Sequence, residues 1–428
     1  MKKYPKYKPS DVEWIGEIPE HWEINRLKYE ALVQSSNVDK KSNEDEKDVL
    51  LCNYMDVYKN EFIDESMNFM EATATEDEIR RFKIVKGDVL VTKDSETPDD
   101  IANPALVKND LENVVCAYHL TQIRPTRKKL YGEYLFRLFQ EHKFNGQFQV
   151  NANGVTRFGL SISSFSDAYI PLPTTDEQTS IANYLDKKTA QIDQLIAKKQ
   201  QLIELLKEER TAIINYAVTK GIDPHVKLKP SGLSACGHAQ AGIEWLGDIP
   251  EHWEIKKLKY VANLKSGDSI SADNIRQEDE YPVYVGNGLR GFTSDYSHEG
   301  ELVLIGRQGA LCGNINYAKG KFWASEHAIV VSRFNKDNII WLGELLRVMN
   351  LNQYSISAAQ PGLSVERIQN LFIPYPAVEE QQEIGKHIET HSQRIECTVA
   401  KIMKEIKLLQ EYRTALISEV VTGKIKVI

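Results

Sequence analysis

The segment WIGEIPEHWEI at residues 14–24 returns as WLGDIPEHWEI at residues 245–255. Extended to Tyr29 and Tyr260, 12 of 16 positions are identical at an offset of 231 residues. Chance does not produce a duplication of this length, and an internal repeat determines the architecture of a chain before any local pattern does. The sequence is therefore built from two copies of one plan.

A second set of repeats runs at an offset of 203 residues, 28 fewer than the first. The pairs are Gly-Leu-Ser at 159–161 and 362–364, Ile-Pro-x-Pro at 170–173 and 373–376, and Arg-Thr-Ala at 210–212 and 413–415. Between these repeated frames lie two blocks of different length and sequence, near 30–169 and 261–372. Short β-branched runs beside turn residues predict a mixed α/β fold for both blocks.

Long helices are predicted at 174–220 and 377–422, because apolar residues recur there in steps of four and three. A mean spacing of 3.5 residues is typical of a coiled-coil seam. Each helix would run about 40–45 residues, or about 60–68 Å. Since the two registers match at one offset, we expect the helices to pair with each other through Leu185, Ile192, Leu195, Leu202, Leu206, Ile213, Ile388, Ile395, Ile402, Leu409 and Leu416. Polar seam positions such as Lys199 and Glu405 either fix the register or are solvated.

The predicted fold class is α+β, with two mixed α/β domains separated by two long antiparallel coiled-coil helices and related by a pseudo-twofold internal repeat. A stretch rich in Pro, Gly, Ser and Ala after the first helix predicts a linker. The predicted organisation is a first domain at 1–172, a helix at 173–220, a linker at 221–243, a second domain at 244–375 and a helix at 376–428.

Composition sets further bounds. The net charge of the 428 residues is −8, but residues 39–78 alone carry −9, so the rest of the chain is nearly neutral. Net charge therefore does not exclude a nucleic-acid partner.

Five scattered cysteines without a C-x-x-C pair argue against disulfides and zinc, and Cys236 with His238 supplies only two metal ligands. With no apolar run of about 18 residues and no signal peptide, we expect a cytoplasmic protein without membrane contact.

Motifs for catalysis are incomplete. The glycines of GNGLRG at 286–291 precede no helix and are interpreted as tight turns. Asn103-Pro104-Ala105-Leu106 lacks the second proline and the aromatic residue of a base methyltransferase loop. Asp99 and Glu141 fit a magnesium-dependent nuclease only loosely. We expect no catalytic residue, no P-loop and no metal site.

The repeated Glu-His-Trp at 20–22 and 251–253 is interpreted as an aromatic plug that packs the chain.

Taken in order and in duplicate, these motifs resemble the specificity (S) subunit of type I restriction–modification systems. The resemblance covers essentially the whole chain, and the segments 281–291, 305–309 and 322–329 also resemble the recognition domains of that family. The chain departs from the family in an enlarged linker at 230–242 and in a less typical first block.

The resemblance implies a non-catalytic subunit of a type I restriction enzyme. Each variable block would be a target-recognition domain that reads one half of a bipartite double-stranded DNA target. The paired helices would form a spacer that docks two modification subunits, which use S-adenosylmethionine to methylate adenine N6. Restriction subunits would supply ATP-driven translocation and Mg²⁺-dependent cleavage. No cofactor is expected on this chain itself.

Base reading needs side chains that bond base edges, chiefly Arg or Lys to guanine and Asn or Gln to adenine. Each candidate either contacts a base, contacts only phosphate, or is a solvated loop residue. The candidates are Arg124, Arg127, Lys128, Asn151, Asn153 and Arg157 in the first block, and Asn287, Arg290, Arg307, Gln308, Asn314 and Lys321 in the second.

Two other classes of protein remain open from the sequence. One is a free-standing Mg²⁺-dependent DNA endonuclease that uses Asp99 and Glu141, and the other is a coiled-coil scaffold that ignores DNA. Cleavage by the chain alone distinguishes the first, and the salt dependence of sequence-specific DNA retention distinguishes the second.

Overall fold

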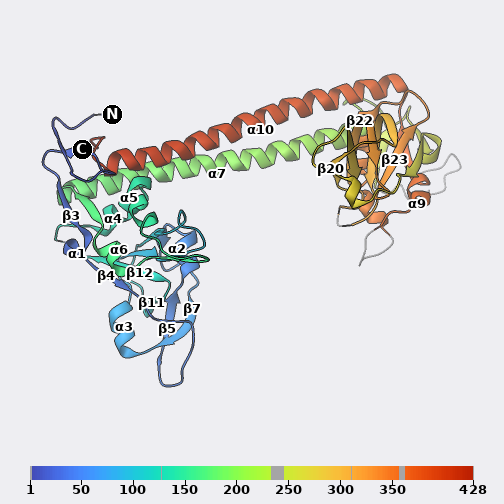
Figure 1. Ribbon diagram of the computed structural model, residues 1–428. Coiled ribbons are helices and arrows are strands. Elements are labelled where there is room, and N and C mark those ends of the chain that lie inside the picture. Colours follow the sequence, from blue (N-terminus) through green and yellow to red (C-terminus); the bar gives the residue numbers. More distant parts are fainter. Residues whose placement is uncertain (1, 127, 233–244, 310, 356–361, 428) are drawn as a thin grey trace. The chain divides into compact units, whose positions relative to one another are not determined.

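The computed structural model describes residues 2–126, 128–232, 245–309, 311–355 and 362–427 (Figure 1). The chain divides into two compact units, Met1–Lys199 with Lys404–Ile428 and Gln200–Met403. The boundaries fall inside the two long helices, so each unit contains one mixed α/β domain and a part of each helix.

The two long helices are α7 (Thr175–Lys220) and α10 (Val378–Val421), of 46 and 44 residues, which confirms both helix predictions (Figure 1). At the start of α7 the Glu177 carboxylate accepts a hydrogen bond from the backbone N–H of Thr174, 3.2 Å away, as in a capping box. The helix ends at Lys220, and the following Gly221 has a φ of +78°, which suits a residue without a Cβ.

The helices pack against each other in both units. In the first unit Ile192 of α7 lies in one hydrophobic core with Leu416 of α10. In the second unit Ile214 of α7 shares a core with Ile388 of α10. The early part of each helix thus contacts the late part of the other, which confirms the antiparallel pairing.

The predicted seam needs one correction. Leu195 and Leu202 are 43% and 44% exposed, whereas Ile203 is 8% exposed and Ile196 packs against the core of the first unit. In an α-helix with 3.6 residues per turn, seven residues fall about 20° short of two full turns. Positions chosen by a strict alternation of four and three therefore rotate away from the buried face along the helix. Five turns of such a helix take 18 residues, which carries the buried face from Leu185 to Ile203. The predicted alternation reaches Leu202 instead, so the buried face lies one residue later than the predicted seam.

In the first unit the domain is built on two sheets. The five-stranded sheet has the order β4 (Ala31–Ser35), β12 (Leu120–Pro125), β8 (Val89–Thr92), β10 (Pro104–Val107) and β6 (Phe62–Ile63). The three-stranded sheet has the order β11 (Val114–Cys116), β5 (Lys47–Cys52) and β7 (Met70–Ala74). The helices are α2 (Tyr54–Lys59), α3 (Glu76–Phe82), α4 (Gly132–Phe139), α5 (His142–Gln149) and α6 (Ile162–Ser166), and β9 (Asp94–Ser95) pairs with β13 (Phe158–Gly159).

The domain of the second unit has a single larger sheet. Its six strands have the order β18 (Ala262–Ser266), β23 (Ala328–Arg333), β21 (His298–Gly306), β22 (Ile315–Ala324), β19 (Tyr281–Val285) and β20 (Gly288–Thr293). The helices are α8 (Ile339–Val348) and α9 (Val365–Gln369), with 3₁₀ turns at Leu258–Tyr260, Ala272–Asn274 and Leu351–Tyr354. The two α/β domains therefore differ in their sheets.

Around these domains the frame is repeated. The first unit has β1 (Tyr7–Pro9), β2 (Glu17–Pro19), β3 (Glu23–Arg26), α1 (Leu27–Glu30) and β14 (Tyr169–Leu172), and the second has β15 (Leu228–Pro230), β16 (Asp248–Pro250), β17 (Glu254–Lys257) and β24 (Phe372–Tyr375). Strand β14 pairs with β3 so that Tyr169 faces Arg26, and β24 pairs with β17 so that Phe372 faces Lys257. These partners are related by the two sequence offsets, so the fold class and its internal repeat are confirmed.

Candidate nucleic-acid interface

The repeated Glu-His-Trp segments anchor each frame to its long helix. Trp22 and Trp253 are 0% and 1% exposed, which confirms their interpretation as an aromatic plug. The neighbouring histidines add a contact that the sequence did not predict. His21 Nε2 lies 2.9 Å from a carboxylate oxygen of Glu177 in α7, and His252 Nε2 lies 2.9 Å from Glu380 in α10.

The environment of Glu177 lowers its pKa. Burial alone would raise the pKa, but hydrogen bonds from His21 and Thr174 stabilise the carboxylate and outweigh burial. The ionised form of Glu177 therefore fixes the Trp-rich segment of the first unit to the start of α7.

The repeated Arg-Thr-Ala motifs place equivalent ion pairs in the two units. Arg413 Nε lies 3.0 Å from Asp193 Oδ1, and Arg210 Nη2 lies 3.3 Å from Glu396 Oε1. Both the arginines and the carboxylates are related by the 203-residue offset. The contact between the helices has thus been duplicated together with the sequence.

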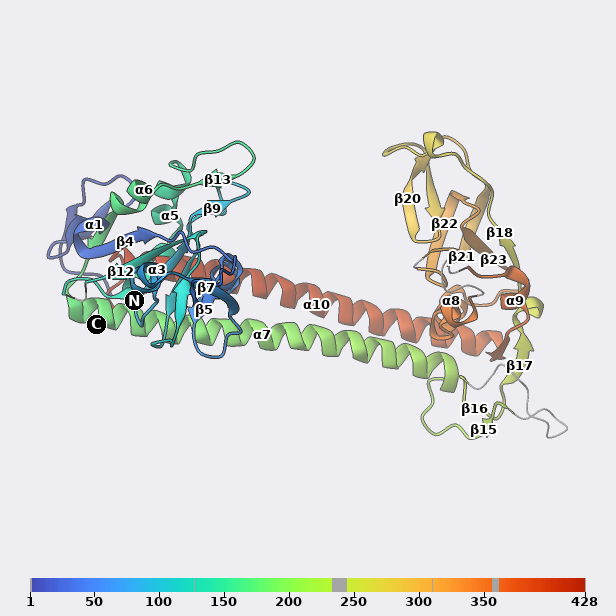
Figure 2. The same cartoon turned by 90° about the horizontal axis from the view of Figure 1, so that it is seen from below.

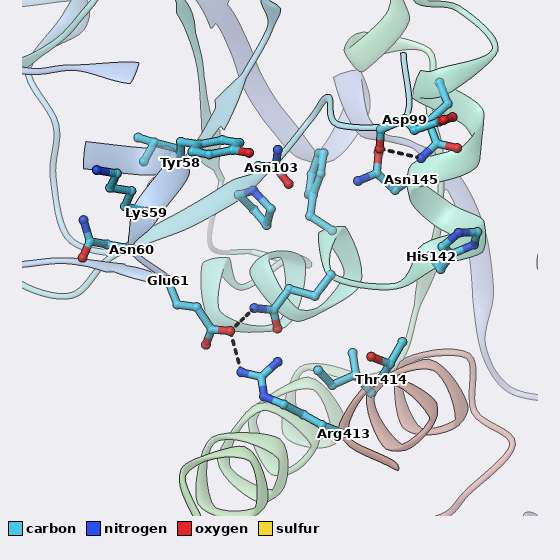
Figure 3. Close-up of a pocket in the computed structure, with 16 residues that line it drawn as sticks. Tyr58, Lys59, Asn60, Glu61, Asp99, Asn103, His142, Asn145, Arg413 and Thr414 are labelled. Carbon is cyan, nitrogen blue, oxygen red and sulfur yellow. Dashed lines mark hydrogen bonds and ion pairs between the residues drawn. The ribbon is translucent and has the colours of Figure 1, made fainter. Parts of the chain in front are cut away.

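Each of these arginines borders a hollow beside an α/β domain. In the first unit a hollow of about 470 Å³ lies between the domain and α10, where Arg413 pairs with Glu61 (Figure 3). In the second unit a hollow of about 460 Å³ is lined by Arg210, Thr211 and Ile214 of α7. Their equivalents Arg413, Thr414 and Ile417 line the first hollow, so the two hollows occupy equivalent helix positions.

Three of the candidates in the first domain lie on one loop. Asn151, Asn153 and Arg157 are all exposed on the 150–159 loop, which follows α5 and includes β13 (Figure 2). Lys128 is exposed in the turn after β12, apart from this loop in the sequence. Arg127 lies outside the described residues.

Arg124 pairs with a buried carboxylate. Its guanidinium donates to both carboxylate oxygens of Asp88 at 2.8 and 2.7 Å, and Asp88 is buried. The hydrogen bonds to Asp88 raise the pKa of Arg124. Nε and Nη2 of Arg124 are engaged by Asp88 and by the Lys83 carbonyl, so this side chain supports the fold. A contact between Arg124 and DNA stays a prediction.

A recess beside the 150–159 loop contains residues that the sequence did not single out. It measures about 480 Å³ and is lined by Tyr54, Tyr58, Asp94, Ser95, Glu96, Asp100, Thr156 and Arg157. The two tyrosine rings stack 5.5 Å apart, and His119 Nδ1 lies 2.6 Å from Asp94 Oδ2. Carboxylates repel phosphate but accept hydrogen bonds from the amino group of cytosine. The recess is therefore suited to a base edge rather than to the DNA backbone.

In the second domain three loops converge. The backbone N–H of Arg307 donates to the His327 carbonyl at 2.8 Å, and His327 Nδ1 lies 3.0 Å from Gln308 Oε1. A Cβ on Gly286 would lie 2.9 Å from that same His327 carbonyl oxygen. The interpretation of the glycine motif as tight turns is confirmed, because β19 and β20 form a hairpin there. Asn287, next to Gly286, is thus brought close to Arg307 and Gln308.

The remaining candidates of the second domain are dispersed. The Asn314 carbonyl accepts from Gly306 at 2.8 Å, which places Asn314 in the same loop as Arg307. Arg290 is exposed on β20. Lys321 lies opposite Glu299, at the other end of β21 from Arg307, with its Nζ 4.5 Å from the Tyr296 ring centre.

Of the two residues considered for a nuclease, one caps a helix and the other lies at the surface. Glu141 is 1% exposed and caps α5 by accepting from the backbone of Phe144, while Asp99 is exposed. Among the described residues, no group of three His, Cys, Asp or Glu side chains is arranged to hold a metal ion. No described helix is long and apolar enough to span a bilayer.

Comparison with known proteins accounts for this duplicated arrangement. The family described as "Type I restriction modification DNA specificity domain" matches residues 19–205 and 250–408, one match in each copy. The type I restriction enzyme EcoprrI specificity subunit of Escherichia coli is 48% identical over 130 residues, which cover 29% of this chain and 32% of that protein. The type I restriction enzyme MjaIX specificity subunit of Methanocaldococcus jannaschii is 24% identical over 96% of this chain and 95% of its own length.

Solved structures share the fold. A chain from a study of complex assembly and conformational transition of the type I R-M system superposes with a TM-score of 0.68 at 17% identity, covering 95% of this chain and 99% of its own. The HsdS subunit from Thermoanaerobacter tengcongensis superposes with a TM-score of 0.55 at 18% identity, covering 95% and 98%. With a family match in both copies, the chain belongs to the type I restriction–modification DNA specificity family.

Proposed function

We propose that this chain selects the DNA target of a type I restriction–modification complex, with each α/β domain reading one half of a bipartite sequence. The observation that supports this proposal is the contrast between the duplicated frame of strands and long helices and the two different α/β domains. Equivalent contacts such as His21–Glu177 and His252–Glu380 hold domains with different sheets. A frame repeated in this way presents two distinct readers to two distinct half-sites.

The same duplication supports the docking of two modification subunits. The hollows beside Arg413 and Arg210 sit at equivalent helix positions, and each would offer the same arginine, threonine and isoleucine to one of two copies of a partner. In this proposal the partners carry the chemistry: S-adenosylmethionine and adenine N6 methylation on the modification subunits, ATP and Mg²⁺ on the restriction subunits. The chain itself contributes recognition, and the complex works in the cytoplasm, where its DNA lies.

Direct reading is assigned first to the converging loops of the second domain. Arg307, Gln308 and Asn287 supply the guanidinium and amide groups that match guanine and adenine in the major groove. Arg307→Ala, in a complex reconstituted with modification subunits, should weaken specific DNA binding about 5- to 150-fold, since a good bidentate contact contributes about 1–3 kcal/mol. Assembly with the modification subunits should not change.

Lys319→Ala is the matched control, because Lys319 is an exposed cation of the same domain that pairs with Glu301. Unchanged affinity of the Arg307→Ala complex would exclude Arg307 as a reader. The purified chain alone, incubated with DNA and Mg²⁺, should cleave nothing, and cleavage would favour the nuclease alternative.

A further inference from the structure

Two apolar side chains project from the 150–159 loop of the first domain. Val155 is 93% exposed and Val150 is 83% exposed, the highest values among the large hydrophobic side chains of the described residues. Single exposed apolar residues are common on proteins. Two such residues within six positions, beside Asn151, Asn153 and Arg157, indicate a surface that another molecule covers.

Hydrogen bonds within the loop close its base. The backbones of Asn153 and Gly159 exchange two bonds of 3.1 and 2.9 Å, which close the loop at its base. A Cβ on Gly154 would lie 1.9 Å from the Arg157 carbonyl oxygen, so only glycine fits this turn. Val155 therefore stands at the tip of a preorganised turn, which lowers the entropic cost of binding.

The base of the loop is joined to the body of the domain. Strand β13 pairs with β9, and the backbone N–H of Leu160 donates to the Lys93 carbonyl at 2.8 Å. Arg157 Nη2 lies 3.3 Å from His119 Nδ1 at the recess. A contact made at the tip is thus positioned relative to the recess by paired strands rather than by a free chain.

The polar groups of the loop suit the edges of base pairs. Asn151 donates through its amide to the Gln147 carbonyl at 2.6 Å, and Asn153 donates to the Asn151 carbonyl at 2.9 Å. Each amide keeps a second N–H for another acceptor, and no described side chain donates to either Oδ1. Amide groups recognise adenine in the major groove, and small apolar groups contact the methyl group of thymine there. Minor-groove wedges use larger side chains such as Phe, Leu and Met.

We propose that the 150–159 loop enters the major groove and that Val155 recognises a thymine through its C5-methyl group. This inference rests on the proposed function and adds a specific reader to it. DNA is favoured over a protein partner because Val150 and Val155 alternate along the loop with Asn151, Asn153 and Arg157, whose side chains are of the types that bond base edges.

The test uses the reconstituted complex and its target duplex, obtained by mapping methylated adenines. Each thymine of both half-sites is replaced in turn by uracil, which removes only the methyl group. One replacement should weaken binding by the wild-type complex about fourfold, since burial of one methyl group contributes about 0.8 kcal/mol. The Val155→Ala complex should bind the thymine and uracil duplexes equally.

Leu32→Ala is the control, because Leu32 is 52% exposed on β4 of the same unit. This complex should retain the wild-type response to uracil. Val155→Ala should leave the unfolding midpoint unchanged, since the valine side chain is almost fully exposed.

Two results would overturn the inference: no thymine whose replacement weakens binding, or a Val155→Ala complex that still distinguishes thymine from uracil. Weaker assembly of the Val155→Ala chain, with normal discrimination by the complex that does form, would also overturn the inference and reassign the surface to a protein partner. A wild-type complex without sequence-specific binding would instead contradict the proposed function.

Discussion

The frame of this protein is duplicated, whereas its two α/β domains differ from each other. The frame repeats residue by residue, so that the Asp193–Arg413 pair of the first unit has a counterpart in Glu396–Arg210 of the second. The domains share no such correspondence, with five- and three-stranded sheets in one and a six-stranded sheet in the other. Under the proposed function, this division would let the target change while the partners are kept, because the duplicated frame would serve assembly and the dissimilar domains would serve reading.

The strongest test of the repeated frame is a charge in the helix seam. Ile192→Asp and Ile395→Asp are equivalent changes at positions that are each 7% exposed. Each should destabilise its own unit by about 3–5 kcal/mol, because an unpaired carboxylate replaces a buried side chain. Hydrogen exchange measured peptide by peptide would report the two units separately. The control Leu195→Asp, at an exposed position, should change stability by less than about 0.5 kcal/mol. Strongly unequal losses from the two seam variants would contradict equivalence.

Removing the aromatic plugs should have an effect of similar or smaller size. Trp22→Ala and Trp253→Ala each empty a buried site, and such changes typically cost about 3–5 kcal/mol, less where the surroundings relax. Urea unfolding followed by circular dichroism measures both losses. Losses that differ by more than about 1 kcal/mol would show that the two plugs are not equivalent.

Arg413 and Arg210 occupy equivalent positions of the repeat but should contribute different amounts to the free energy of unfolding. Arg413 has 19% of its side chain exposed and contacts both Glu61 and Asp193, whereas Arg210 is 43% exposed and contacts Glu396 and Ser392. Arg413→Ala should cost about 1.5–3 kcal/mol, and Arg210→Ala less than about 1 kcal/mol. Urea unfolding at low and high salt would compare them. The reverse order would mean that the Glu61 contact contributes little.

The smallest effect concerns pH. Because the folded state lowers the pKa of Glu177, its ionised form adds stability above the unfolded-state pKa of about 4.3, and this contribution is lost as pH falls through the folded-state pKa. Glu177→Gln should therefore cost up to about 1.5 kcal/mol near neutral pH and nothing at sufficiently low pH. Unfolding measured at several pH values checks this prediction, with Glu380→Gln as the matched change in the second unit. A cost that does not vary with pH would exclude an electrostatic origin.

Local and repeated features were predictable from the sequence. The predicted seam departs from the packed face at Leu195 and Leu202, where the true helical period carries it to Ile196 and Ile203. The Asn153-Gly154 turn signal was present and could have located the 150–159 loop. The Arg124–Asp88 pair was not visible, because it joins residues 36 positions apart across a sheet. The His21–Glu177 contact was hidden because its two partners belong to repeats with different offsets.

Adenine methylation, mapped across a genome in cells that carry the modification subunits, tests the central claim most directly. With this chain present, we predict methylation of one gapped, two-part sequence. When residues 31–168 are exchanged for the corresponding block of another family member, only one of the two parts should change. Methylation that does not depend on the chain, an uninterrupted target, or an exchange that alters both parts would contradict the account.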